Sequence, residues 1–328
     1  MTNRSTYPRL LGDIGGTNAR FVLETGPRRF EYVQVLACAD YRSLESALAS
    51  YLDYALAQCR SPIRHAALAI ANPVDGDSVK MTNHHWHFSI SALRERFAFD
   101  TLEVVNDFKA LAMALPLLPR EKTVKVGAGK ARKESVIGLV GAGTGLGVSA
   151  LIPVDGKYVA MDSEGGHVTF SPSTDTEMAI LHIARRDYPH VSAERLMSGV
   201  GLHIVYRALA ELENCTPDDI DVPQIIKRGL AKSCAICDKT IDAFCDMLGT
   251  LAGNVGVTFG AKGGIYIGGG IVPRLGTRFA DSGFRARFES KGRFSSYLAE
   301  IPTYVIVDDF PAFLGVSAIL DQSSRACS

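Results

Sequence analysis

The stretch Leu11-Gly12-Asp13-Ile14-Gly15-Gly16-Thr17-Asn18-Ala19-Arg20 is the most informative part of the sequence for the fold. Apolar residues lead into it from Leu10, and Phe21-Val22-Leu23 follow, so the pattern predicts two strands joined by a tight glycine-rich turn. The paired glycines leave backbone N–H groups uncovered, which suits phosphate oxygens. The Asp13 carboxylate can hold Mg²⁺ or its water shell beside them, and Thr17 and Asn18 add short polar groups. A plain hairpin is the alternative, but a hairpin does not require Asp, Gly-Gly, Thr and Asn together.

Composition indicates a soluble globular chain without a strong electrostatic preference. The 328 residues suit two lobes of ordinary size better than one core, and 35 basic residues balance 35 acidic ones. The chain therefore has no excess of positive charge that would indicate binding to nucleic acid or an anionic membrane. We expect no signal peptide in Met1–Arg9 and no transmembrane run. Seven scattered cysteines fit a reducing cytoplasm better than a disulfide scaffold.

Two clusters of potential metal ligands have structural explanations. Cys234 and Cys237 have C-x-x-C spacing, but together with Ile241 and Cys245 they repeat at three and four residues, which predicts one packed face of a helix. The histidines beside Trp86 lack a third ligand at matching spacing, and a polar strand edge accounts for them better. They are His84, His85 and His87.

Strand and helix patterns alternate through the first third of the chain. We expect strands at Phe30–Cys38, His65–Ile70 and Thr101–Asn106, with helices at Ser43–Cys59 and from Asp107. Pro116 and Pro119 mark a lobe boundary. The later strands are expected at Ser135–Val140, Val148–Pro153, Lys157–Met161, Gly264–Gly268 and Thr303–Val307. The later helices are expected at Leu202–Glu211, Ser233–Phe259 and Pro311–Leu320, with a further helix that starts at a Thr174/Glu177 capping box.

A second glycine loop, Gly141 to Gly147, follows an apolar strand and contains Thr144. Alone it is a weak signal, because glycine loops also serve as simple turns. Together with the first loop in another lobe it predicts a clamp for a triphosphate. No Gly-x-Gly-x-x-Gly fits the first loop, and the chain contains no Gly-x-x-x-x-Gly-Lys-Ser/Thr.

The segment from Asp13 to Asn18 resembles the first phosphate motif of the superfamily of sugar kinases, actin and heat-shock chaperones, and its wording resembles the bacterial glucokinases. The resemblance covers nearly the whole chain, including Met81-Thr82-Asn83 with Trp86, Ser198-Gly199 and Gly292-Arg293-Phe294. It implies an α/β, two-lobed actin-like ATPase (ribonuclease H-like) fold with nucleotide and sugar in the interlobe cleft. Residues 1–117 plus 308–328 would form a small lobe and 118–307 a large one, so that the last helix packs on the first lobe.

The same resemblance implies a nucleotide site built from three segments. Loop 141–147 is similar to the second phosphate motif, and Gly264–Gly270 is similar to the segment that receives adenosine. The ATP-binding residues implied are Gly12, Asp13, Ile14, Gly15, Gly16, Thr17, Asn18, Gly143, Thr144, Gly145, Gly269 and Gly270. Asp13 would also hold Mg²⁺, through water.

Asn106 and Asp107 stand where a strand ends and a helix starts, which is where ligands of α/β sheets gather. Spacing alone favours a helix N-cap over a ligand site. However, Val105-Asn106-Asp107-Phe108 resembles the glucokinase segment with the catalytic aspartate. This implies that Asp107 is the general base for the 6-hydroxyl of the sugar and that Asn106 bonds a sugar hydroxyl.

The segment Ser163-Glu164-Gly165-Gly166-His167 resembles the glucokinase sugar-binding loop, so Glu164 and His167 are implied substrate contacts. Glu and His at this spacing are also compatible with a metal. Val191-Ser192-Ala193-Glu194-Arg195 resembles the next sugar-contacting stretch, with Glu194 as the contact. A solvated helix charge is the other interpretation of Glu194.

The implied activity is ATP-dependent phosphorylation of D-glucose at O6 with Mg²⁺ as cofactor, which gives glucose 6-phosphate for glycolysis. The resemblance also implies a cytoplasmic homodimer. A sugar-responsive regulator is a rival hypothesis, but about a dozen residues precede Asp13, too few for a helix-turn-helix. Two further hypotheses are an actin-like assembly ATPase and a kinase for another hexose, such as mannose, fructose or N-acetylglucosamine.

Overall fold

The computed structural model describes residues 7–81 and 84–326. The chain divides into two compact units, unit 1 with Met1–Leu118 and Asp309–Ser328, and unit 2 with Pro119–Asp308. No helix in the described ranges is both long and apolar enough to cross a membrane. Thr82 and Asn83 of the resemblance lie outside the described residues.

Unit 1 is built on a five-stranded sheet of order β3-β2-β1-β4-β7. The strands β1, β2 and β3 are antiparallel neighbours, whereas β1, β4 and β7 run parallel. The parallel strands therefore end at one edge of the sheet. The bounds are β1 Arg9–Ile14, β2 Asn18–Gly26, β3 Arg29–Ala37, β4 His65–Ile70 and β7 Thr101–Asn106.

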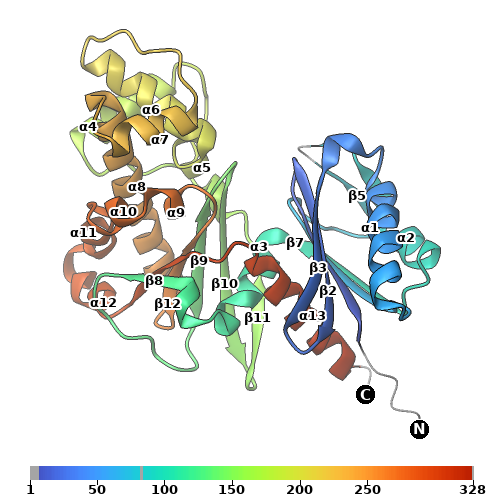
Figure 1. Ribbon diagram of the computed structural model, residues 1–328. Helices are drawn as coiled ribbons and strands as arrows, with labels where there is room; N and C mark the ends of the chain where they lie inside the picture. The colour runs from blue at the N-terminus through green and yellow to red at the C-terminus, as the bar shows by residue number, and fades with distance from the viewer. Residues whose placement is uncertain (1–6, 82–83, 327–328) are drawn as a thin grey trace. The chain divides into compact units, whose positions relative to one another are not determined.

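Helices cover both faces of this sheet because apolar residues alternate along its strands (Figure 1). Leu10 packs in a cluster with α1 (Leu44–Cys59) and α2 (Ile90–Arg96). Its neighbour Leu11 packs on the opposite face with α3 (Asp107–Ala114) and α13 (Pro311–Ala326). The last helix of the chain thus packs on the sheet that carries the first glycine turn. Strands β5 (Ser78–Lys80) and β6 (His87–Ser89) form a separate antiparallel pair in this unit.

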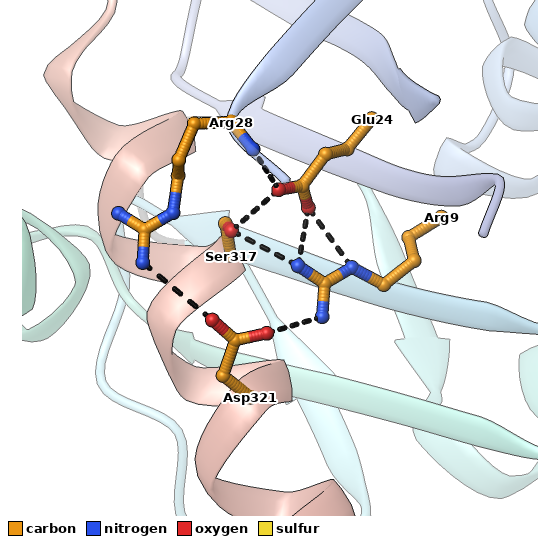
Figure 2. A network of polar contacts seen from close by, with 5 residues as sticks. All are labelled: Arg9, Glu24, Arg28, Ser317 and Asp321. Atoms are coloured by element: carbon orange, nitrogen blue, oxygen red, sulfur yellow. Dashed lines mark hydrogen bonds and ion pairs between the residues drawn. The ribbon is translucent and has the colours of Figure 1, made fainter. Parts of the chain in front are cut away.

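A buried polar network ties α13 to the first hairpin (Figure 2). Arg9 donates to Glu24 at 2.9 Å and to Asp321 at 2.6 Å, and neither Arg9 nor Glu24 reaches solvent appreciably. Ser317 donates to Glu24 at 3.0 Å and accepts from Arg9 at 3.1 Å. The backbone N–H of Arg28 also donates to Glu24. The buried charges are thus paired and hydrogen-bonded, as burial requires.

Unit 2 contains a six-stranded sheet of order β11-β10-β9-β12-β13-β8. Strand β9 is central, antiparallel to β10 and parallel to β12. Residues of β9 and β12 pack in one large core with the helices of the unit. The bounds are β8 Thr123–Val126, β9 Ile137–Ala142, β10 Leu146–Val154, β11 Lys157–Met161, β12 Gly264–Gly268 and β13 Thr303–Ile306.

Helices α6, α7, α11 and α12 pack against the long helix α8 (Ala235–Phe259), which ends at Gly260 in the left-handed conformation. Cys237 and Cys245 are buried on this helix, and burial raises the pKa of each thiol to about 12. Cys234 is the N-cap of α8 rather than part of it. The other helices are α4 Asp175–Ala184, α5 Ala193–Leu196, α6 Gly199–Leu212, α7 Val222–Leu230, α9 Val272–Leu275, α10 Thr277–Ala280, α11 Phe284–Glu289 and α12 Ser295–Ala299. The short 3₁₀ helices are η1 Cys38–Asp40, η2 Leu115–Leu117, η3 Arg120–Lys122, η4 Gly165–His167 and η5 Gly292–Phe294.

Two local predictions need correction. Thr174 caps α4, but the Glu177 carboxylate accepts the N–H of Ser173 and pairs with Arg287, so no reciprocal capping box forms. His84 and His85 precede strand β6 instead of lying in it; their rings face each other at 4.2 Å and His84 contacts the buried Trp86. At Glu177 the tertiary pair with Arg287 outweighs the local pattern.

Candidate active site

The first glycine turn connects β1 to β2 and is held at both ends. The N–H of Gly15 donates to the carbonyl of Asn18 at 2.9 Å, and the N–H of Cys38 donates to the carbonyl of Thr17 at 2.8 Å. The Thr17 side chain is exposed, whereas Gly12 is buried within β1. A Cβ at Gly12 would lie 2.5 Å from Leu68, so packing against β4 already requires glycine there.

Asp13 lies directly opposite Arg20 in the β1–β2 hairpin. A guanidinium N–H of Arg20 donates to Oδ2 of Asp13 at 2.9 Å, and the Asp13 side chain is 21% exposed. Burial raises the pKa of the Asp13 carboxyl, and the charge of Arg20 opposes that effect. A nearby cation in place of water would favour the carboxylate further. Arg20 was not identified from the sequence as the partner of Asp13, because the pattern predicted the turn but not the register of the two strands.

Asp13, Asn106 and Asp107 share the carboxyl edge of the unit 1 sheet. Along the three parallel strands, Ile14 is in register with Ile70, and Ile70 with Asn106. Two strand spacings separate β1 from β7, a distance of about 10 Å. The residues from both motifs of unit 1 therefore belong to one edge, which is the usual position of ligands in sheets of this kind.

Asn106 caps α3, as its spacing alone predicted. Its Oδ1 accepts the N–H groups of Phe108 and Lys109 at 2.9 and 3.3 Å, while its Nδ2 donates to the carbonyl of Asn72 at 3.3 Å. Asp107 is the first residue of the helix, and its Oδ1 also accepts from Phe108 N at 2.9 Å. The carboxylate is thus half-buried and oriented at the positive end of the helix dipole.

In unit 2 the second glycine turn, Gly143 to Gly145, connects β9 to β10. The N–H of Gly143 donates to the carbonyl of Gly145, and the Gly143 carbonyl accepts the N–H of Gly199 at the start of α6. The segment after β12 lies against the same turn. Gly269, at φ +86°, approaches so closely that a Cβ there would lie 2.2 Å from the carbonyl oxygen of Ala142. Thr144 is exposed at the tip.

The three side chains proposed to contact sugar come together in unit 2. His167 Nε2 lies 3.8 Å from Glu164 Oε2, and His167 Nδ1 lies 3.9 Å from Glu194 Oε1. Glu164 and His167 are 69% and 57% exposed, while Glu194 is 32% exposed. A charged acceptor, an imidazole and a second carboxylate at this spacing present alternating acceptors and donors, an arrangement suited to vicinal hydroxyls. Glu194 is therefore more than a solvated helix charge.

A groove of about 810 Å³ lies beside the second glycine turn and was not predicted from the sequence. It begins at Thr144 and runs between the first turn of α6 and the segment before α7. No motif marks it, because its walls are ordinary apolar and polar side chains that only the packing of α6 and α7 brings together. It is lined by Thr144, Gly199, Val200, His203, Asp219, Ile220, Asp221, Val222 and Gln224.

Known proteins match this chain along nearly its full length. The glucokinase family model matches residues 10–323. A bifunctional protein of Burkholderia pseudomallei is 55% identical over 316 residues, which are 96% of this chain but 49% of that protein. The chain thus spans about half the length of the first curated relatives that it matches. A glucokinase of Neisseria meningitidis is 47% identical over 319 residues, covering 97% of this chain and 96% of that protein.

The fold of this chain also matches that of a solved protein structure. The crystal structure of a glucokinase from an Antarctic psychrotroph has a TM-score of 0.88 and 37% identity, covering 96% of this chain and 99% of that one. The α/β, two-lobed actin-like fold predicted from the sequence is confirmed. Family model, sequence identity and fold agree, and the chain belongs to the glucokinase family.

Proposed function

We propose that this chain transfers the γ-phosphoryl group of ATP to O6 of D-glucose. The observation that carries the proposal is the convergence of Glu164, His167 and Glu194 at the turn of a glycine loop in unit 2. In this proposal, a polyol site beside a phosphate loop brings the acceptor hydroxyl close to the phosphoryl donor. Family membership supports glucose as the hexose and ATP as the donor.

In this proposal Asp107 is the general base. Its carboxylate is oriented by the N–H of Phe108 and accepts the proton of the 6-hydroxyl as that oxygen attacks phosphorus. Asn106 offers an amide N–H to a second hydroxyl while its Oδ1 caps the helix. The N–H groups that the two glycine turns do not use internally, at residues 16–17 and 144–145, stabilise the charge that develops on the phosphoryl oxygens.

The ATP site also includes the segments carrying Gly12, Ile14 and Asn18, together with Gly269 and Gly270. Gly12 acts there through packing, because a Cβ at its position within β1 would meet the side chains of Leu68 and Phe21. Gly269 shapes the second turn by its close approach to Ala142. Their part in ATP binding rests on the resemblance of both segments to the family motifs.

We also propose that Asp13 holds Mg²⁺ through water. Among the residues that the structure describes, no three His, Cys, Asp or Glu side chains are grouped to bind a metal by themselves. Mg²⁺ in kinases is typically held by one or two carboxylates plus substrate phosphates, so a single partly exposed carboxylate beside a glycine turn fits it. The bond from Arg20 engages Oδ2 only. When bound, the ion neutralises charge on the terminal phosphates.

A homodimer in the cytoplasm completes the proposal and rests on the family resemblance alone. Analytical ultracentrifugation of the purified chain tests the dimer directly. A sedimentation coefficient of a monomer at micromolar concentration would exclude it under those conditions.

A coupled assay with ATP, Mg²⁺ and D-glucose tests the proposed activity, with glucose 6-phosphate detected through its dehydrogenase. Direct detection of ADP extends the assay to mannose, fructose and N-acetylglucosamine. We expect kcat/KM for glucose to exceed that for the other hexoses by about tenfold or more, since sites that hydrogen-bond hydroxyls discriminate strongly. Higher efficiency with another hexose would change the substrate and keep the chemistry. Sugar-independent ATPase activity would replace the proposal with the assembly ATPase.

A further inference from the structure

The carboxylate of Glu194 has two different partners. Its Oε2 accepts the backbone N–H of Leu146 at 2.9 Å, across a sequence separation of 48 residues. Its Oε1 faces the imidazole of His167 at 3.9 Å. Leu146 is the first residue of β10, directly after the second glycine turn. One side chain therefore contacts both the second glycine turn, called the phosphate loop below, and the segment 163–169, called the sugar loop below.

The fit at the turn is close. A Cβ on Gly145 would lie 2.6 Å from Oε2 of Glu194, so this carboxylate occupies the space beside the turn that a side chain would take. The contact is also partly buried, because Glu194 is 32% exposed. A hydrogen bond to a charged acceptor in such a position contributes more than an average neutral one.

The backbone of the Glu194 segment is tied to the sugar loop as well. The N–H of Ala193 donates to the carbonyl of Val168 at 2.8 Å, and Thr169 and Ser192 form an antiparallel bridge. The carbonyl of Leu146 packs against Gly166, where a Cβ would lie only 1.8 Å away. Leu146 thus accepts no displacement toward the sugar side without a clash at Gly166, and its N–H is bonded to Glu194.

We infer that Glu194 is a positioning residue for the second phosphate loop, in addition to its proposed contact with the sugar. Oε2 fixes the end of the turn at Leu146, and Oε1 remains directed to the sugar side at His167. The geometry of the turn that receives phosphate oxygens thereby depends on a residue of the sugar site. This inference rests on the proposed function for the identity of the ligands.

The test compares Glu194→Ala with Glu194→Gln and with Glu164→Ala. The Gln amide oxygen can still accept from Leu146, whereas Ala cannot. At saturating glucose, we expect Glu194→Ala to raise the KM for ATP by about tenfold, the loss typical of a charge-assisted hydrogen bond. Glu194→Gln should keep the KM for ATP close to the wild-type value. Glu164→Ala, which removes a sugar-loop carboxylate without an observed contact to Leu146, should raise the KM for glucose and leave the KM for ATP near the wild-type value.

Binding of Mg²⁺–ADP without sugar, measured by calorimetry, separates this inference from the proposed function. Weaker ADP binding in Glu194→Ala, restored in Glu194→Gln, supports the positioning role even if the wild-type chain phosphorylates no sugar. ADP affinity that is equal in wild type and both Glu194 variants would overturn it, whatever the glucose kinetics. Circular dichroism tests whether each variant is folded. If Glu194→Ala does not fold, Glu194→Leu replaces it, because leucine also lacks an acceptor for the N–H of Leu146.

Discussion

At the scale of single residues, several side chains that the family resemblance assigns to ligands already have structural partners. Asn106 caps α3, and Glu194 holds Leu146. These contacts fix the orientation of each side chain before a ligand arrives, which lowers the entropic cost of binding. A ligand role and a structural role are therefore compatible at these positions, and mutations must be chosen to separate them.

The variant Asp107→Asn separates the chemical role from the structural role at the proposed catalytic base. The amide keeps an oxygen that can accept from Phe108 N, and the Asn106 cap of α3 is untouched, but the amide cannot act as the base. We expect kcat to fall by about 10²- to 10⁴-fold, the usual contribution of general base catalysis. Glucose binding, measured by calorimetry, should change little. Asp53→Asn, an exposed substitution of the same kind on α1, is the matched control. A variant with wild-type kcat would remove Asp107 from the mechanism.

Glu164→Gln tests the sugar site. The carboxylate is 69% exposed and lies 3.8 Å from His167, so the fold should tolerate the change. Loss of one charge-assisted hydrogen bond to a hydroxyl should raise the KM for glucose by about tenfold while kcat falls less. Glu300→Gln, at an exposed glutamate of unit 2 near Lys262, is the control. If the KM for glucose is the same in both variants and the wild type, Glu164 does not contact the sugar.

At this scale the sequence was informative where chemistry depends on neighbouring residues. The segment Asp13 to Asn18 predicted both the turn and its flanking strands, because glycines and polar residues act locally there. The bond between Glu194 and Leu146 could not be predicted, since nothing local indicates a partner 48 residues away. The groove beside Thr144 was missed for the same reason, as it exists only where α6 and α7 pack.

At the scale of secondary-structure elements, apolar segments with clear end signals were predicted well. Strands β4, β7, β11 and β12 have the predicted bounds, and α1 begins after its Ser43 cap. The elements β8, α7 and α9 were not predicted: β8 and α9 have only four residues each, and α7 contains Pro223 and Gly229, which locally indicate a break. Tertiary contacts stabilise those elements.

The packing of α13 on α3 depends on a single small residue. A Cβ at Gly315 would lie 1.7 Å from the carbonyl oxygen of Ala110, which is backbone and cannot move aside without shifting a helix. We expect Gly315→Ala to destabilise the protein by about 1–3 kcal/mol, as measured by urea unfolding. It should also lower kcat, because α3 begins with Asp107. Gly26→Ala is the control, since no atom lies within 4 Å of its Cβ position. Equal urea midpoints for Gly315→Ala and Gly26→Ala would show that α3 and α13 accommodate the added methyl group without loss of stability.

At the scale of the whole molecule, each unit has a core of its own. The clusters around Leu10 and Leu11 lie in unit 1, and the large cluster around Val140 lies in unit 2. Unit 1 is assembled from both ends of the described chain, and the network of Arg9, Glu24, Ser317 and Asp321 joins them. The stability of unit 1 thus depends on a contact between segments about 300 residues apart.

Glu24→Gln weakens that contact without changing its shape. The buried Arg9 loses its fully buried counter-charge and keeps only Asp321, which should destabilise unit 1 by about 3 kcal/mol. Glu31→Gln breaks the exposed pair with Arg29 in the same unit and should cost less than about 1 kcal/mol. Hydrogen exchange monitored by mass spectrometry locates the effect. Because the cores are separate, we expect Glu24→Gln to speed exchange in β1, β4 and α13 and to leave β9, β12 and α8 protected as in the wild type. Equal acceleration in both sets would mean that the two units unfold as one cooperative body, so that a defect at Glu24 also reaches the glycine turn of unit 2.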